Sequence, residues 1–353
     1  MRIFFCLALY LIATGCVKEV TLNIRNPKPT LVVEGLLLTD STPCKVTLSY
    51  SGAFNKNGGQ LQDFINGATV YLKEIESEDS VQLVNIDNGA YVEAPNSKIF
   101  AKPGNSYSLS IQLLDGSVYA SIPEKIVPVP KDFMIDSIGV GVPYKLDDLY
   151  GADISIETTD PADQTNYYRW ITAQDYIPRK ATGFPCNSSE NCEMYCYQSY
   201  TDRTINILSD ALINGKQIKY QPTIVSPYYW YGRHYVELKQ LSLTKEAYQF
   251  WKLFQEQTTR TGSILDPLPS PVNGNIYNVN DPNELALGFF EASDVATLKF
   301  VIAPQFMNSY YTLAYAFRYV DPQQRACYEA YPNAMKYPPA DWEDAPEYLI
   351  QVY

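Results

Sequence analysis

Residues 107–121, YSLSIQLLDGSVYAS, decide the fold class of this chain. The apolar residues Tyr107, Leu109 and Ile111 alternate with polar ones, which is the pattern of a strand with one buried face. The Asp-Gly pair at 115–116 predicts a hairpin turn before a second alternating strand. A β-hairpin at this point indicates a mainly β protein.

Further strands are predicted on both sides of this hairpin. The stretches LVVEGLLL at 31–38, CKVTLSY at 44–50 and ATVYLKE at 68–74 are either continuously apolar or cleanly alternating. Seven or so short strands separated by turns predict a β-sandwich over residues 31–130. The order NGATVYL, NGAYVEAP, KPGNSYSLSI resembles transthyretin-like and carboxypeptidase-regulatory-like sandwiches, which are usually non-catalytic. The expected fold of this region is therefore a transthyretin-like or immunoglobulin-like β-sandwich.

A second β-rich domain is expected over residues 131–353, after the closely spaced prolines at 123, 128 and 130. In TNYYRWITAQDY, Tyr168 and Trp170 share one face of a strand, whereas Arg169 lies on the other. One amphipathic helix is predicted near 243–259, with Ser242 as its N-terminal cap and Gly262 as its end. The tail from 321 to 353 is expected to be irregular.

Composition supports packed β domains and argues against two classes of partner. The 353 residues are 46% hydrophobic and only 19% charged, with 30 tyrosines, 24 prolines and 18 glycines. The formal net charge of −12 argues against nucleic acid and against electrostatic docking on anionic lipid, since both need basic patches.

The amino terminus resembles a bacterial lipoprotein signal. Arg2 precedes a short apolar run that ends in LIATGC at 11–16, and a run of about ten apolar residues is too short to span a bilayer. This pattern predicts a signal peptide at 1–15, acylation of Cys16 and a tether at 16–30. The alternatives are an ordinary signal peptide with a chance cysteine, or a buried N-terminal strand. Lys18-Glu19 after the cysteine resembles a surface-export signal of bacterial lipoproteins, and this resemblance implies export to the cell surface.

The remaining cysteines divide into one buried thiol and four candidates for disulfides. Cys44 shares a strand face with Val46 and Leu48, so we expect a free thiol in a core. In an exported protein the other four suit two disulfides with three possible connectivities. The alternative, a zinc site in CNSSENCEMYC, lacks standard ligand spacing. The four candidates are Cys186, Cys192, Cys196 and Cys327.

No catalytic residues, metal ligands or cofactor are predicted. His234 is the only histidine, and no nucleophile elbow, phosphate loop or selected carboxylate pair accompanies it. Five aspartates in KLDDLYGAD and TTDPADQTN are possible calcium ligands, but Asp-Pro and Asx turns are the simpler explanation of them. One group of aromatic residues is a candidate for binding a ligand or a partner protein, because aromatic side chains supply large rigid contact area. The alternative is that these residues pack in a core. The group consists of Tyr228, Tyr229, Trp230, Tyr231 and Tyr235.

Six motifs in this order resemble the DUF4249 family, a domain of unknown function found in Bacteroidota lipoproteins. They are LVVEGLL, GATVYL, KPGNSYSLSI, TNYYRW, LSLTKEAYQFWKLFQEQ and GNIYNVNDPNELALGFF. The resemblance implies an outer-membrane lipoprotein, commonly encoded beside TonB-dependent transporters, with no assigned catalytic residues. Paired cysteines near a carboxyl-terminal Trp are common in that family, whereas this chain has the single Cys327 there.

These observations lead to one expected function and one alternative. The chain is expected to be a non-enzymatic, surface-facing lipoprotein that binds substrate or docks on a TonB-dependent transporter or another outer-membrane protein. The alternative is a structural subunit of an envelope assembly or adhesion complex. Both rest on family context more than on particular residues.

Overall fold

The computed structural model describes most of the chain from residue 29 onward, and the described part is mainly β, as predicted. The described ranges are 29–51, 63–95, 99–143, 150–162, 164–181, 195–200, 204–228, 233–259, 272–304, 318–319, 327–331 and 333–350. Within them, no helix is long and apolar enough to cross a membrane.

Eleven of the described strands form one sheet. They are β1 (Leu31–Leu38), β2 (Lys45–Tyr50), β3 (Asp63–Phe64), β4 (Thr69–Glu74), β5 (Ser80–Asp87), β6 (Ala90–Val92), β7 (Ser106–Gln112), β8 (Val118–Ser121), β9 (Glu124–Lys125), β17 (Ile276–Asn278) and β18 (Leu287–Ser293). Their order is β17-β8-β7-β4-β5-β6-β2-β1-β18, with β3 beside β2 and β9 beside β7. The strands predicted at 31–38, 44–50 and 68–74 are confirmed as β1, β2 and β4.

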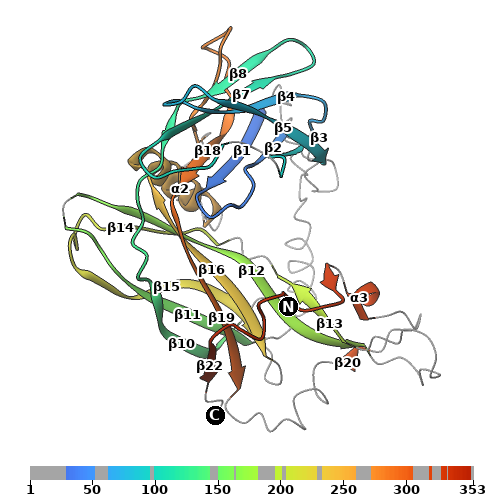
Figure 1. Cartoon of the computed structure of the whole chain (residues 1–353), viewed down its shortest axis with the longest axis vertical. Helices are drawn as coiled ribbons and strands as arrows, with labels where there is room; N and C mark the ends of the chain where they lie inside the picture. Colours follow the sequence, from blue (N-terminus) through green and yellow to red (C-terminus); the bar gives the residue numbers. More distant parts are fainter. Residues whose placement is uncertain are drawn as a thin grey trace, which may run out of the picture.

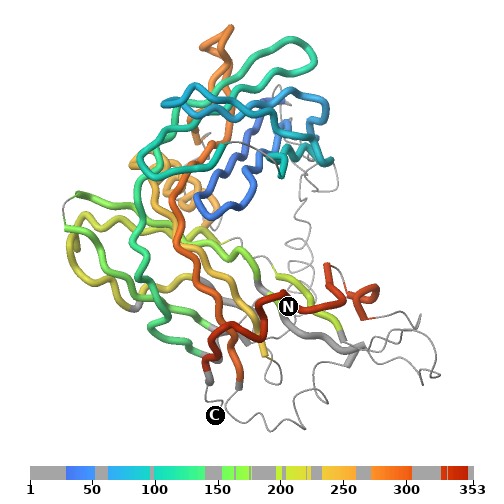
Figure 2. Tube along the Cα trace, in the orientation of Figure 1, coloured from blue at the N-terminus to red at the C-terminus, as the bar shows by residue number. Residues whose placement is uncertain are grey.

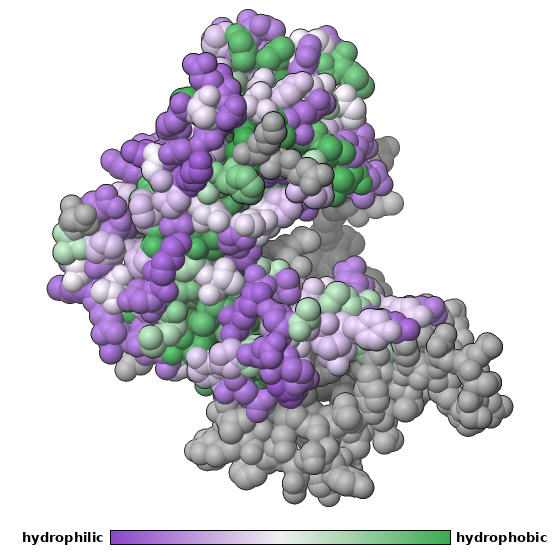
Figure 3. Space-filling model, viewed as in Figure 1, coloured by the Kyte–Doolittle hydropathy of each residue, from purple (hydrophilic) through white to green (hydrophobic). Residues whose placement is uncertain are grey.

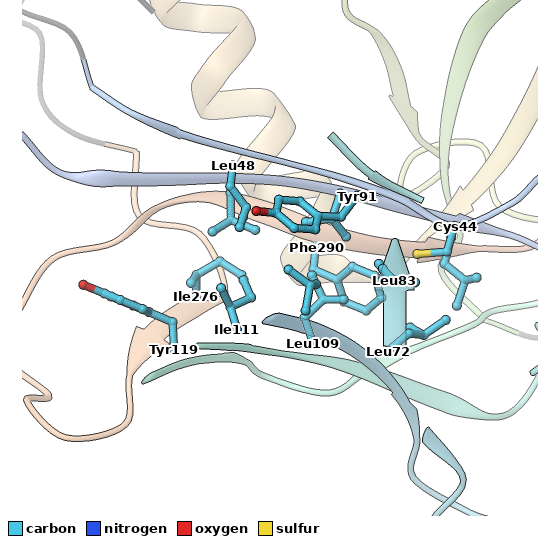
Figure 4. Close-up of a cluster of buried hydrophobic side chains, with 14 of the residues drawn as sticks. Cys44, Leu48, Leu72, Leu83, Tyr91, Leu109, Ile111, Tyr119, Ile276 and Phe290 are labelled. Carbon is cyan, nitrogen blue, oxygen red and sulfur yellow. The ribbon is translucent and has the colours of Figure 1, made fainter. Parts of the chain in front are cut away.

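This sheet folds over at β5. Residues 80–83 of β5 pair with β4, whereas residues 84–87 pair with β6. The two halves of the sheet therefore face each other, and Figure 4 shows Leu48 and Tyr91 pointing from one half toward Leu109 of the other. The sheet is continuous, so the transthyretin-like or immunoglobulin-like detail of the expected sandwich stays a prediction.

The second body consists of two sheets packed face to face (Figure 1). The first has the order β10-β11-β15, and its strands are β10 (Met134–Pro143), β11 (Tyr150–Thr159) and β15 (Gln217–Tyr228). The second has the order β21-β13-β12-β16-β19-β22, with β14 and β20 beside β12. Its strands are β12 (Tyr167–Ala181), β13 (Tyr195–Ser199), β14 (Asn206–Ser209), β16 (His234–Leu243), β19 (Val295–Pro304), β20 (Arg318–Tyr319), β21 (Ala334–Met335) and β22 (Glu347–Ile350).

Alternation along the strands fills the core between these two sheets. Ile154 and Ile156 of β11 are buried against Trp170 of β12. Phe300 of β19 joins the same cluster, as does Val236 of β16. The predicted faces of β12 are thus confirmed, because Tyr168 and Trp170 enter this core whereas Arg169 points to the other side of the sheet.

After α2 the chain returns to the first sheet, where it forms β17 and β18. β17 pairs with β8, and β18 pairs in parallel with β1 from Val32↔Leu287 to Leu38↔Ser293. After Asp294 the same run of chain continues as β19 in the second body (Figure 2). The predicted boundaries, 31–130 and 131–353, therefore miss that residues 276–293 belong to the first sheet. Parallel pairing joins strands distant in sequence, so no local pattern reveals it.

Gly288 permits the parallel pairing of β18 with β1. Its φ is +92°, and a Cβ at this position would lie 1.9 Å from the carbonyl oxygen of Val33. Only glycine adopts this conformation at such close backbone approach without a clash.

The predicted helix is confirmed as α2 (Lys245–Thr258), but its cap differs from the prediction. Ser242 lies inside β16, and the cap is Thr244, whose hydroxyl accepts a hydrogen bond of 3.2 Å from the backbone N–H of Ala247. A cap needs extended backbone followed by helical backbone, and β16 continues through Leu243. The predicted end at Gly262 lies outside the described residues. A second short helix, α3, spans Cys327–Ala330.

Asp294 fixes the junction between the two bodies. Its carboxylate accepts hydrogen bonds from the hydroxyl of Thr39 at 2.5 Å and from the backbone N–H of Val129 at 2.9 Å. Lys131 Nζ lies 2.8 Å from the same carboxylate. Burial opposes ionisation, but these donors hold the pKa of Asp294 below its usual value. The Asp294 carboxylate therefore holds the β1–β2 turn and the segment after β9 together, at the junction between β18 and β19.

Candidate functional site

The outer face of the first sheet, opposite its core, forms the floor of a cavity. Two rows of side chains cross this floor from β2 through β1 to β18, as the strand register requires. Thr47, Glu34 and Phe289 form one row, and Lys45, Leu36 and Glu291 form the next. The floor therefore combines apolar side chains with two exposed ones of opposite charge, Glu34 and Lys45.

Helix α2 forms the wall above this floor. Phe250 is buried and packs on Phe289, with 4.9 Å between the ring centroids. Phe254, one turn further along, is 41% exposed and stacks on Phe250 at 6.1 Å. The aromatic side chains of the predicted amphipathic helix therefore have two roles. Phe250 anchors the helix, and Phe254 leaves an aromatic ring open to the cavity.

A buried ion pair fixes the helix to the second body. Arg169 Nη1 lies 2.7 Å from Glu291 Oε2, and the Glu291 side chain is only 2% exposed. Trp251 Nε1 donates to the same oxygen at 2.5 Å, and the Arg169 guanidinium lies 3.6 Å from the Trp251 ring centroid. Ser293 donates to the other oxygen of Glu291 at 3.2 Å. A carboxylate paired and hydrogen-bonded in this way holds its partners in one geometry.

Between floor and wall lies an open cavity of about 670 Å³. This volume falls within the range of roughly 300–1,000 Å³ that is typical of sites for small molecules. Most of its lining is apolar, with Arg169, Lys45 and Glu34 as the charged members. The main apolar contributors are Val32, Leu36, Phe254, Val272, Leu287 and Phe289. An apolar cavity with a few fixed polar groups suits the binding of an amphipathic ligand.

The charged groups of the cavity differ in how far they are compensated. The charge of Arg169 is neutralised by Glu291. Within the described part of the chain, neither Glu34 nor Lys45 makes an ion pair. Glu34 occupies the middle strand of the floor, next to Phe289. Among the described residues, Glu34 therefore lies on the middle strand of the floor without an ionic partner, and Lys45 lies without one in the next row.

A second buried carboxyl group lies behind the start of α2. Glu124 of β9 is 5% exposed and accepts a hydrogen bond from the hydroxyl of Thr244. Burial, together with the nearby carboxylates of Glu291 and Glu246, raises the pKa of Glu124 to about 8. Its protonation state therefore bears on the stability of this junction.

The structure places the predicted aromatic constellation in different environments. Tyr235 is fully buried in β16 and stacks on Trp342, with 5.9 Å between the ring centroids. Its hydroxyl donates to Asp341 at 3.0 Å, and burial followed by this carboxylate raises the pKa of Tyr235. Tyr228 ends β15. The other three predicted members, at 229–231, lie outside the described residues.

Two of the four predicted disulfide cysteines are joined. Cys196 of β13 and Cys327 of α3 form a disulfide that closes 131 residues of chain. Cys186 and Cys192 lie outside the described residues, as does the lipidation site Cys16. Cys44 is confirmed as a buried free thiol, and burial raises its pKa.

The described ranges bring together no cluster of residues for the catalytic and metal chemistry that the sequence analysis considered. His234 is buried in β16. No group of three or more described His, Cys, Asp or Glu residues could hold a metal ion. Of the aspartates considered for calcium, Asp160 is buried and accepts a hydrogen bond of 2.5 Å from Tyr168, while Asp153 lies in β11.

Sequence reasoning did not predict the cavity. Glu34 interrupts the apolar run LVVEGLLL, and Arg169 interrupts the aromatic run YYRW. A charge inside a predicted buried strand is a signal that its side chain points away from the core, toward solvent or toward a polar partner. The partner of Arg169, Glu291, follows only from the pairing of β18 with β1.

The family comparison covers most of the chain. The family model described as Domain of unknown function (DUF4249) matches residues 17–299. Among curated proteins, none matches the chain.

Proposed function

This chain belongs to the DUF4249 family, and on that premise we propose that it is a lipid-anchored accessory protein of the outer membrane. In this proposal the protein is non-enzymatic, faces the cell surface and either binds a substrate or docks on a TonB-dependent transporter. Cys16 carries the anchor, and the folded part from residue 31 onward carries the binding function.

The cavity between α2 and the outer face of β1 is the observation that carries the binding role. It has the size and apolar lining of a ligand site, and its wall is held by the Arg169–Glu291 pair. A preformed site loses less entropy on binding than one that must be ordered first.

The anchor is supported by LIATGC at 11–16. Two or three acyl chains on one cysteine give stable attachment without any basic surface, which suits a net charge of −12. Replacement of Cys16 by Ser should release the protein from membranes, and a Cys44→Ser variant is the matched control because Cys44 is buried in the fold.

Purification of the lipidated protein from native membranes in mild detergent tests the partner. Co-purification of a TonB-dependent transporter supports the proposal, provided that mild proteolysis of the lipoprotein or of the transporter abolishes it. Stable association with other envelope machinery instead favours the alternative, a structural subunit. A lone protein that turns over a substrate contradicts both.

A further inference from the structure

We infer that the cavity between α2 and β1 binds an amphipathic organic cation, with its apolar body against Phe254 and its ammonium group at Glu34. This inference names the class of ligand for the proposed binding role and rests on that role. It follows from the positions of the charges, the aromatic wall and the size of the space.

The charge at the centre of the floor is negative. Glu34 stands between Thr47 and Phe289, and its neighbours on the same face of β1 are Val32 and Leu36. Water solvates this carboxylate while the cavity is open. A ligand whose apolar body displaces that water must supply a positive charge or hydrogen-bond donors, because a desolvated carboxylate without a partner is costly.

The two positive groups of the cavity compete only weakly for an anion. Arg169 is already paired with Glu291 and stacked on Trp251. Lys45 lies one row further along the floor and is exposed, so its flexible side chain can extend into solvent. Arg169 is therefore neutralised before any ligand binds, whereas Lys45 has no ion pair among the described residues but lies in the row beside that of Glu34.

The aromatic wall suits the apolar body of such a ligand. Phe254 lines the cavity and is 41% exposed, so its ring offers apolar surface that the ligand can cover. The net charge of −12 further raises the local concentration of cations around the whole protein.

A matched series of fluorescent probes separates charge from apolar body. Pyrenebutylamine, pyrenebutanol and pyrenebutyrate share one ring system and differ in a positive, neutral or negative end group. Energy transfer from tryptophan and fluorescence anisotropy report binding to the full-length mature protein. We expect the amine to bind about fivefold more tightly than the alcohol, since an exposed ion pair contributes up to about 1 kcal/mol.

Three variants locate the probe. Glu34→Gln should bring the amine to the affinity of the alcohol. Glu256→Gln, on the exposed side of α2 and outside the cavity lining, removes the same charge and should leave that preference intact. Phe254→Ala should weaken all three probes by about fivefold, because it removes apolar wall that the ring system covers. Thermal unfolding of each variant checks that the fold is retained.

Several results would overturn the inference. They are equal or tighter binding of the alcohol or carboxylate, an equal loss in Glu34→Gln and Glu256→Gln, full binding in Phe254→Ala, or no binding of any probe. These results leave membrane attachment and partner co-purification untouched, so failure of this inference is distinct from failure of the proposed function.

Discussion

The ion pair between Arg169 and Glu291 gives the most direct energetic test of how the two bodies are joined. Glu291 is 2% exposed, and Arg169 is 16% exposed and covers the Trp251 ring. Replacing Arg169 by Met keeps an apolar side chain against Trp251 but leaves a buried carboxylate with only the Trp251 and Ser293 donors. Breaking a buried pair in this way costs about 3 kcal/mol.

Replacing the acidic partner, Glu291, is expected to lower the free energy of unfolding by less than replacing Arg169. In Glu291→Leu the Arg169 guanidinium loses its partner but keeps partial access to water, so we expect a loss of about 2 kcal/mol. The double variant Arg169→Met/Glu291→Leu removes both charges and should also lose only about 2 kcal/mol. The coupling energy between the two positions is then about 3 kcal/mol, which is large against a total stability of roughly 5–15 kcal/mol.

Urea denaturation followed by tryptophan fluorescence and by far-ultraviolet circular dichroism measures these free energies of unfolding. A Lys219→Met/Glu157→Leu cycle is the matched control, because that pair is 3.5 Å apart with side chains that are 48% and 21% exposed, and its coupling should be under 1 kcal/mol. If the Arg169 and Glu291 losses simply add in the double variant, the pair does not act as a unit and the account of the junction is wrong.

Three further perturbations have defined outcomes. Because burial raises the pKa of Glu124 from 4.5 to about 8, its contribution to stability is intact below pH 4.5 and is lost as pH rises through 8. Glu124→Gln should therefore leave the free energy of unfolding nearly unchanged at pH 5 and raise it at pH 9, by at most about 5 kcal/mol; urea titrations showing no such pH dependence would refute the burial argument. Replacing both Cys196 and Cys327 by Ala should lower the free energy of unfolding by about 2–5 kcal/mol, since the bond closes 131 residues, and an unchanged denaturation midpoint would contradict this. Gly288→Ala should destabilise the protein by more than 2 kcal/mol or prevent folding, whereas Gly104→Ala, with positive φ but no atom within 4 Å, should cost less; equal melting temperatures for the two variants would argue against the β1–β18 approach.

Local features of the fold were predictable because they depend on short-range periodicity. The hairpin at 107–121 appears as β7 and β8, and the helix appears within two residues of its predicted limits. The burial of Cys44 followed from alternation in CKVTLSY. In each of these cases the residues that decide the structure lie close together in sequence.

Features that depend on distant pairing were not predictable. The return of β17 and β18 to the first sheet joins residues more than 150 positions apart, as in Tyr277↔Ala120. The cap of α2 moved to Thr244 because β16 runs further than its pattern indicates. The cavity combines residues of β1, β2, β12, β18 and α2, so it follows from topology and not from any one motif.

Mass analysis of the mature amino terminus, on protein extracted from native membranes, tests the central claim most directly. A membrane-anchored binding protein requires that the chain start at Cys16 and carry acyl groups there. We predict a first residue of Cys16 with two or three fatty acyl chains. A mature protein with an unmodified terminus, or one that still carries residues 1–15, would contradict the account.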